Sequence, residues 1–153
     1  MTELTIRPLE DADRPGWQDL WAQYNAFYGR EGKTALAPEI VDEAWARLLS
    51  DAEPVHGLVA VRDGALMGLV HIVFHRNLLR VPDTCYLQDL FTVSAVRGEG
   101  IGRRLIEAVG ERCRAHGVGD IYWHTHSGND VARALYDRVA TNTEFLVYRL
   151  KLD

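Results

Sequence analysis

The sequence has 153 residues, of which 47% are hydrophobic and 25% are charged. This length suits one folded domain, expected here over residues 1–153, and this balance is typical of a globular chain and excludes a disordered one. The net charge of −5 argues against nonspecific nucleic-acid binding, which needs clustered cations, and mildly favours a cationic small molecule.

No apolar run approaches the roughly 20 residues that span a bilayer, and the first residues lack the basic and apolar regions of a signal peptide. We therefore expect a cytoplasmic protein with no membrane contact. Its two cysteines, Cys85 and Cys113, fall in a strand-like run and on the apolar stripe of a helix-like run. Both are expected in the core, and neither a disulfide framework nor a metal site is predicted.

The first half of the chain alternates between strand-like and helix-like patterns. Period-two alternation indicates strands, apolar residues three and four apart indicate helices, and Asp63-Gly64 is a hairpin signal. Pro8 puts the first strand near an edge, Asp11 or Asp13 is expected to cap the first helix, and Pro38 opens the second. The predicted elements are a strand at 4–9, helices at 14–28 and 38–49, hairpin strands at 56–62 and 65–75, and a strand at 84–93.

The second half continues with a helix at 102–116 that ends at Gly117, the expected residue for a left-handed C-cap. A strand at 120–125, a helix at 129–139 and a last strand at 145–152 follow. This order predicts an α/β fold with a mixed sheet, helices on both of its faces and a strand-helix-strand crossover.

The segment that joins the strand at 84–93 to its helix is rich in glycine. It reads Arg97-Gly98-Glu99-Gly100-Ile101-Gly102-Arg103. Alternating glycines accept positive φ and let a ligand approach the main chain, and the first amides of a helix favour an anion. An ordinary turn is the plain alternative. The spacing excludes a dinucleotide fingerprint, which needs a third glycine where this chain has Arg103. It also excludes a P-loop, which needs Gly-Lys where this chain has Arg103-Arg104.

The pattern Arg-x-x-Gly-x-Gly between a strand and a helix resembles the pyrophosphate loop of the GCN5-related N-acetyltransferases (GNAT superfamily). Residues 86–91, Asn129 and residues 135–137 are similar to those of diamine and Hpa2-like acetyltransferases. The resemblance implies a GNAT fold, in which the strands at 84–93 and 120–125 splay apart to admit coenzyme A. It also implies acetyl-CoA as cosubstrate, no metal, and a homodimer.

Carried over residue by residue, the resemblance implies main-chain contacts to pantetheine and a pyrophosphate cradle. The pantetheine contacts are Leu90, Phe91 and Thr92, and the cradle is Arg97, Gly98, Glu99, Gly100, Ile101, Gly102 and Arg103. Asn129 is an expected helix N-cap, and the family pattern makes it a coenzyme A contact as well.

Tyr136 follows Asn129 by almost two helical turns, so both lie on one face of the predicted helix. In the family, a tyrosine here donates a proton to the departing thiolate. A phenol, with an ordinary pKa of about 10, is a reasonable partner for a thiol of about 8.5. A packed tyrosine with its hydroxyl bonded is the structural alternative.

Gln88 and Asp89 are the candidate residues for binding the molecule that accepts the acetyl group. Diamine acetyltransferases carry a glutamate where this chain has Gln88, and an amide is not a useful base. Strand alternation sends Asp89 to the opposite face, so that it would hold the acceptor, act through water if a bulge re-aims it, or be a paired structural acid. Tyr24 and Tyr28, with Trp21, are candidates for the acceptor pocket or for core packing.

Four histidines, His71, His75, His124 and His126, lie in or beside predicted strands as relays or as structural rings. After Tyr136 the chain also lacks the Gly-Phe turn of many relatives.

The resulting hypothesis is an acetyl-CoA-dependent N-acetyltransferase whose acceptor attacks directly in a ternary complex. The acceptor is a primary amine of a polyamine, another small molecule, or a peptide or protein. A weakly catalytic coenzyme A-binding sensor or interaction module, and a nucleotide- or phosphate-binding module, are the alternatives.

Overall fold

The computed structural model of the protein describes residues 2–153. The described chain divides into two compact units, one that ends at Trp123 and one from His124 to Asp153. The single domain over residues 1–153 stays a prediction.

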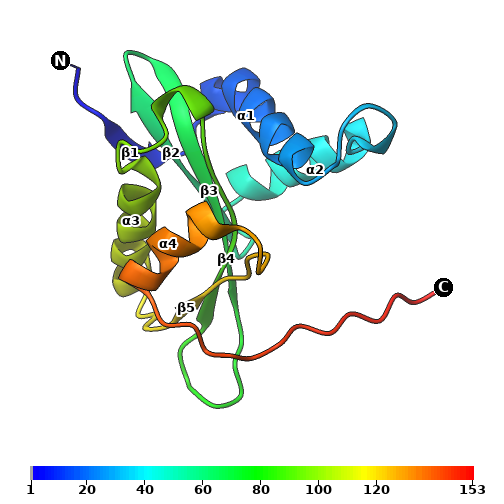
Figure 1. Cartoon of the computed structure of the whole chain (residues 1–153), viewed down its shortest axis with the longest axis vertical. Helices are drawn as coiled ribbons and strands as arrows, with labels where there is room; N and C mark the ends of the chain where they lie inside the picture. The colour runs from blue at the N-terminus through cyan, green and yellow to red at the C-terminus, as the bar shows by residue number, and fades with distance from the viewer. Residues whose placement is uncertain (1) are drawn as a thin grey trace. The chain divides into compact units, whose positions relative to one another are not determined.

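The first unit is built on a five-stranded sheet in the order β1-β2-β3-β4-β5 (Figure 1). All neighbours are antiparallel except β4 and β5, which are parallel. The strands are β1 (Thr5–Pro8), β2 (Val55–Arg62), β3 (Ala65–His75), β4 (Thr84–Thr92) and β5 (Ile121–Tyr122). The mixed sheet is as predicted, with Pro8 on the edge strand β1, where a missing amide donor is tolerated.

The turn between β2 and β3 is the two-residue turn that Asp63-Gly64 predicts. Both residues have positive φ, 54° at Asp63 and 75° at Gly64. Two left-handed residues match the right-handed twist of the flanking strands, so the hairpin closes without splaying.

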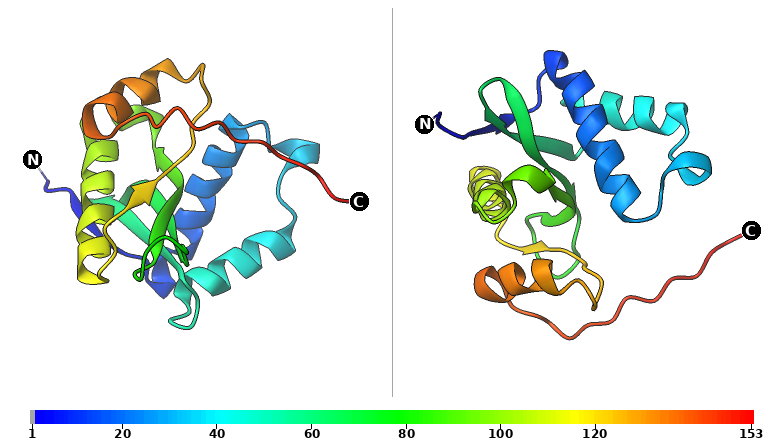
Figure 2. Two further views of the ribbon diagram at one scale, coloured as in Figure 1. Left: turned by 90° about the horizontal axis from the view of Figure 1, so that it is seen from below. Right: turned by 45° about the horizontal axis from the view of Figure 1, so that its top comes forward.

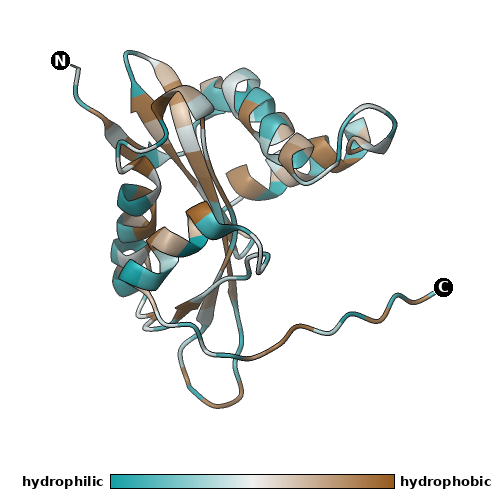
Figure 3. Cartoon of the chain, viewed as in Figure 1, coloured by the Kyte–Doolittle hydropathy of each residue, from teal (hydrophilic) through white to brown (hydrophobic). Residues whose placement is uncertain are grey.

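Helices α1 (Arg14–Phe27) and α2 (Pro38–Leu49) cover one face of the sheet (Figure 2). Their apolar stripes meet side chains of β2, β3 and β4 in a single core, and Figure 3 shows the apolar colouring of these strands. The buried members are Trp17, Leu20, Trp45, Val59, Leu69 and Phe91. No helix among residues 2–153 is long and apolar enough to cross a membrane.

Helix α3 (Ile101–Ala115) packs on the opposite face and makes the crossover from β4 to β5. It comes so close to β3 that a Cβ on Gly68 would lie 3.1 Å from Leu105 Cδ1. The helix ends at Gly117, whose φ of 71° is the predicted left-handed cap. Cys85 and Cys113 are buried as expected.

Asp13 is the N-cap residue of α1, one of the two predicted positions, but its side chain makes no capping hydrogen bond. Its two carboxylate oxygens accept from Arg7 at 2.7 Å and 2.9 Å, and the Glu10 amide donates to it at 2.8 Å. The hydrogen bond from Arg7 is the main cause that lowers the pKa of Asp13, against its burial. The bidentate pair thus ties β1 to the start of α1.

Replacing Asp13 by Asn should lower the free energy of unfolding at pH 7 by about 1–3 kcal/mol, the range for a charged hydrogen bond. Because the folded pKa is lowered, this stabilisation exists above the unfolded pKa of about 3.9 and is lost as pH falls through the folded value. Urea unfolding at pH 7 and pH 3 should therefore give a difference that shrinks in acid. The exposed Asp42, paired with Arg14, is the control, and its Asn variant should change stability by less than about 0.5 kcal/mol. A difference for Asp13→Asn that persists at pH 3 would contradict the assignment.

The second unit contains one helix, α4 (Asp130–Val139). The predicted last strand at 145–152 is wrong, since residues 140–153 form neither helix nor strand. The large apolar residues there are exposed, from 66% at Val147 to 90% at Phe145. The strand at 120–125 is also shorter than predicted and ends at Tyr122.

Candidate active site

The glycine-rich segment forms a bend that leads directly into α3. Gly98 and Gly100 have positive φ, 87° and 80°, and a Cβ on either would meet no atom within 4 Å. The Gly100 carbonyl accepts the first helical bond, from the Arg104 amide at 3.1 Å. The amides of the first helical turn therefore have no intrahelical acceptor, and the bend has the form of an anion cradle.

The charged side chains of this bend already have partners. Glu99 pairs with Arg62 at 3.1 Å, and Arg103 pairs with Glu107 at 3.2 Å one turn along α3. The Arg97 Nε donates to the Thr92 carbonyl at 3.2 Å, and its guanidinium lies 5.7 Å from the Phe91 ring centre. The positive character of the bend thus comes first from main-chain amides rather than from free arginines.

Strand β5 pairs only with the beginning of β4. The parallel ladder joins Cys85 to Ile121 and Tyr86 to Tyr122, whereas β4 runs on to Thr92. Within the sheet of the first unit, the rest of β4 has no strand on its β5 side. This is the splay expected between these strands, and Leu90, Phe91 and Thr92 lie along the open stretch.

A bulge interrupts β4 at Gln88. Ile72 of β3 is opposite Leu87 and His71 is opposite Asp89, so Gln88 has no partner in the register. An extra residue of this kind turns the strand and re-aims the side chains next to it. As a result Gln88 and Asp89 line the same cavity, and the expectation from simple alternation that they face apart is wrong.

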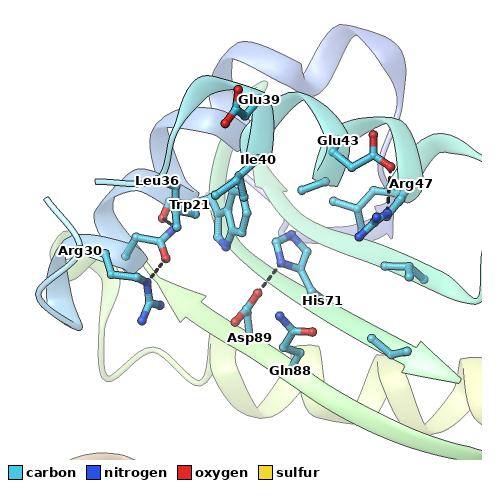
Figure 4. Close-up of a pocket in the computed structure, with 15 residues that line it drawn as sticks. Trp21, Arg30, Leu36, Glu39, Ile40, Glu43, Arg47, His71, Gln88 and Asp89 are labelled. Atoms are coloured by element: carbon cyan, nitrogen blue, oxygen red, sulfur yellow. Dashed lines mark hydrogen bonds and ion pairs between the residues drawn. The ribbon is translucent and has the colours of Figure 1, made fainter. Parts of the chain in front are cut away.

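This cavity has a volume of about 690 Å³ and lies on the face of the sheet that α1 and α2 cover (Figure 4). Its floor comes from β3 and β4 and its walls from the two helices and the segment between them. The lining side chains that carry charge or hydrogen-bonding groups are Trp21, Asn25, Arg30, Glu39, Glu43, Arg47, His71, Gln88 and Asp89. A cavity of this size suits a small molecule.

A chain of buried polar side chains supports Asp89. The Trp17 indole donates to His71 Nε2 at 2.9 Å, and His71 Nδ1 lies 2.8 Å from Asp89 Oδ2. An indole N–H can only donate, so His71 Nε2 is an acceptor and the proton of the neutral ring is on Nδ1. His71 therefore donates to Asp89, and the carboxylate is the acceptor at the end of the chain.

The Tyr24 hydroxyl is a second donor to Asp89. Burial, and then the negative charge of Asp89, raise the pKa of Tyr24 far above its ordinary value. The phenol therefore keeps its proton and its donor role across the working pH range. With two donors fixed on it, the Asp89 carboxylate, whose residue is 6% exposed, still has lone pairs for a ligand.

Tyr24 and Tyr28 are not among the residues that line the cavity. Tyr24 stands behind Asp89 as its donor, and Tyr28 packs on the Tyr24 ring at 5.0 Å with 44% of its surface exposed. Trp21 does line the cavity. Of these three aromatic candidates, only Tyr24 is thus bonded to the Asp89 carboxylate.

In the second unit Asn129 caps α4, and its Oδ1 accepts from the Ala132 amide at 3.4 Å. The N-cap part of the prediction is confirmed. Tyr136 lies on the same helix, and the pairing of both residues with coenzyme A stays a prediction. His124 and His126 precede α4 outside any strand, and His126 Nδ1 accepts from the Gly128 amide at 3.0 Å.

His75, another of the candidate histidines, lies outside the cavity. His75 Nε2 lies 2.8 Å from the Tyr122 hydroxyl. Among residues 2–153, no group of three or more histidine, cysteine, aspartate or glutamate side chains could hold a metal ion.

Sequence reasoning missed the hydrogen bond of Trp17 to His71 and the place of Arg30 in the lining of the cavity. Trp17 reads as one more core residue of an aromatic stripe, and Arg30 stands in a polar loop where no motif singles it out. His71 was only one of four histidines. The hairpin signal and a correct register across β3 and β4 would have put His71 opposite Asp89, but the bulge hides that register in the sequence.

Comparison with known proteins identifies acetyltransferases as relatives of this chain. The acetyltransferase (GNAT) family model matches residues 15–140. The D-amino-acid N-acetyltransferase HPA3 of Saccharomyces cerevisiae is 30% identical over 148 residues, which are 95% of this chain and 89% of the yeast protein. The uncharacterized N-acetyltransferase YhfO of Bacillus subtilis is 25% identical, over 97% of this chain and 98% of its own.

A solved structure, that of AAC(6')-Iy in complex with the bisubstrate analog CoA-S-monomethyl-acetylneamine, has the same fold. It superimposes with a TM-score of 0.82 and 17% identity, and 99% of each chain is covered. With a family match over most of its length and a 30% identical relative, the chain belongs to the acetyltransferase (GNAT) family and is an N-acetyltransferase.

Proposed function

We propose that the protein transfers the acetyl group of acetyl-CoA to a primary amine of a small molecule that binds in the cavity above Gln88 and Asp89. The observation that carries this proposal is the buried Asp89 carboxylate, which His71 and Tyr24 hold at the bulge of β4. It supplies the anionic group that an ammonium ligand needs, in place of the glutamate that Gln88 replaces.

The first unit has the features that coenzyme A requires. The bend at Gly98 and Gly100 offers open space and main-chain amides for a diphosphate. The β4 edge from Leu90 to Thr92 offers main-chain groups that can pair with the amides of an extended pantetheine arm, as a neighbouring strand would. The cosubstrate supplies an acetyl group activated as a thioester.

The acceptor must lose a proton as it reacts. An alkylammonium has a pKa of about 10.4, so only about one molecule in 10³ is neutral at pH 7. Asp89 attracts the ammonium into the cavity and accepts its proton, directly or through water, before the nitrogen attacks the acyl carbon. His71 and Trp17 are positioning residues, because His71 holds the carboxylate and Trp17 holds His71.

The bonds balance in one direct transfer. The nitrogen lone pair forms the new C–N bond, the C–S bond breaks, and its electron pair goes to sulfur. Before the nitrogen can attack, the ammonium gives one proton to Asp89, directly or through water, and Tyr136 gives a proton to the thiolate in the role that the family resemblance implies. The nitrogen loses its second proton as the amide forms, and that proton returns through solvent to the Tyr136 phenolate. No covalent acyl-enzyme is needed, and holding the two reactants together supplies much of the rate.

The named relatives support small amines as acceptors. The yeast relative is a D-amino-acid N-acetyltransferase, and the AAC(6')-Iy ligand joins coenzyme A to an acetylated neamine. Gln88 favours the alternative of a weakly catalytic coenzyme A-binding module, because an amide is not a useful base. Asp89 weighs against that alternative, because its carboxylate lines the same cavity.

The test is release of coenzyme A thiol, followed with DTNB, across a panel of amines, with mass spectrometry of the product. Wild type should release thiol with at least one small amine. Tyr136→Phe should lower kcat roughly 10- to 100-fold while the KM for acetyl-CoA stays within about threefold, because only the proton to the leaving sulfur is lost.

Tyr148→Phe is the matched control, since Tyr148 lies in the C-terminal segment and is 89% exposed. It should keep the wild-type kcat. Unchanged kcat in Tyr136→Phe would remove Tyr136 from the reaction, and no thiol release with any amine would refute the proposed function.

A further inference from the structure

We infer that the acceptor is an amino-acid-like molecule, whose carboxylate binds the Arg30 guanidinium while its ammonium binds Asp89. The inference rests on the proposed function and names the substrate class of the same cavity. It requires a cation that is held in place, faces the cavity and has no internal anionic partner, and Arg30 meets these conditions.

Arg30 follows the end of α1 and is anchored by a buried amide. The Asn25 Oδ1 accepts from Arg30 Nε at 2.7 Å, and the Asn25 carbonyl accepts from the Arg30 amide at 2.9 Å. Asn25 is only 5% exposed and donates through Nδ2 to the Trp21 carbonyl at 2.9 Å. The Arg30 guanidinium also lies 5.6 Å from the Tyr28 ring centre.

This anchoring uses Nε and leaves the two terminal nitrogens of the guanidinium for a ligand. A fixed planar fork suits a carboxylate, which it can bind through two parallel hydrogen bonds. Because Asn25 and Tyr28 have already restricted the side chain, ligand binding costs less conformational entropy than it would for a free arginine.

The charges around the cavity single out Arg30. Arg47, the other lining arginine, pairs with Glu43 at 3.1 Å on the exposed surface of α2. Within residues 2–153 no carboxylate forms an ion pair with Arg30. Glu39 is an exposed acid at the α2 side of the cavity. Arg30 is thus the partly buried cation that lacks compensation.

Arg30 and Asp89 act on a common group. The positive charge of Arg30 lowers the pKa of Tyr24, whereas burial and the charge of Asp89 raise it more strongly. Both therefore lie within electrostatic reach of the hydroxyl that bonds to Asp89. Figure 4 shows the two side chains, from the end of α1 and from β4, around the same cavity.

An α-amino acid carries the complementary pair of charges on two groups attached to the same α-carbon. Its ammonium matches Asp89 and its carboxylate matches Arg30, whereas a polyamine offers cations to both places and would leave Arg30 facing a like charge. A second cation could reach Glu39, so a diamine is the competing ligand that the experiment must include.

The experiment compares alanine with alaninamide, in both enantiomers, and includes putrescine. The two alanine compounds have the same α-amine, and only the first has a carboxylate. Wild type should favour one enantiomer of alanine, and Arg30→Gln should lower its kcat/KM roughly 10- to 100-fold, the loss expected for a charged hydrogen-bonded pair. The kcat/KM for alaninamide should stay within about threefold, and Arg30→Lys should recover part of the loss.

Arg76→Gln is the matched control and should change neither substrate by more than about threefold, because Arg76 lies outside the cavity and its charge is paired with Asp83 on the surface. Calorimetry with N-acetylalanine gives a readout without turnover. This product has a carboxylate and no ammonium, so its binding should weaken by the same factor in Arg30→Gln.

The outcomes separate the two proposals. If alaninamide is acetylated but Arg30→Gln changes both substrates equally, or if putrescine is preferred to alanine, the carboxylate site is refuted and the acetyltransferase function stands. If no amine is acetylated yet N-acetylalanine binds through Arg30, the proposed reaction fails and the carboxylate site remains.

Discussion

Replacing Asp89 by Asn is expected to lower kcat by about 10²-fold or more, the usual contribution of a positioned acid or base. Asn keeps the shape of the side chain, and its carbonyl can still accept from His71 Nδ1 and from Tyr24. What it loses is the negative charge that attracts the ammonium and the ability to take its proton. The loss should therefore appear in turnover rather than in folding.

The pH profile distinguishes this role from a structural one. The Asn variant must use acceptor that is already neutral, so its residual rate should rise about tenfold per pH unit toward the amine pKa of about 10.4. Wild type should depend less on pH because Asp89 draws on the protonated amine. Asp83→Asn is the control, since Asp83 pairs with Arg76 in the loop before β4. A wild-type kcat in Asp89→Asn would exclude the carboxylate from catalysis.

The glycine bend, the helix ends and the β2–β3 turn could be predicted because each depends on a few adjacent residues. Gly117 ends α3, Pro38 opens α2, and Asp63-Gly64 closes the hairpin, as the sequence indicates. In each case one residue type fits a backbone conformation that others adopt only at a cost. Local chemistry of this kind does not need the rest of the fold.

The side chains of β4 that line the cavity could not be predicted because their directions depend on the strand register. Simple alternation separates Gln88 from Asp89, and one extra residue brings them to the same cavity. The same register puts His71 opposite Asp89, so the buried network also depends on it. Nothing in residues 84–93 marks the bulge, since its cause lies in pairing with β3 rather than in local preference.

The strand predicted at 145–152 is absent because local residue preference alone does not form a strand. Its β-branched and aromatic residues favour an extended chain, but a strand also needs a neighbour that accepts and donates its main-chain hydrogen bonds. Within the second unit α4 is the sole regular element among residues 124–153, and it offers no such edge. The residue types of this segment favour a strand, but the prediction also assumed a neighbouring strand, which the second unit does not contain.

A change at Gly100 should weaken the binding of acetyl-CoA without harming the fold. Gly100 has a φ of 80° at the N-cap of α3, and Asp and Asn tolerate this conformation better than other residues do. Gly100→Asp places a carboxylate at the amides proposed to hold the diphosphate. Its KM for acetyl-CoA should rise at least about tenfold above that of Gly100→Asn, since two like charges then meet at one helix terminus.

Gly100→Asp should bind acetyl-CoA more weakly than Gly100→Asn but should not be less stable. A negative charge at a helix N-terminus stabilises the helix by about 0.3–1 kcal/mol, so Gly100→Asp should unfold at a temperature no lower than Gly100→Asn. The KM for the amine should be equal in the two variants, because Gln88 and Asp89 are unchanged. A general loss of structure would lower stability and raise both KM values together, whereas repulsion of the diphosphate raises only one. Equal acetyl-CoA KM values in the two variants would place the diphosphate away from this bend, and the amides of α3 would then be an ordinary helix start.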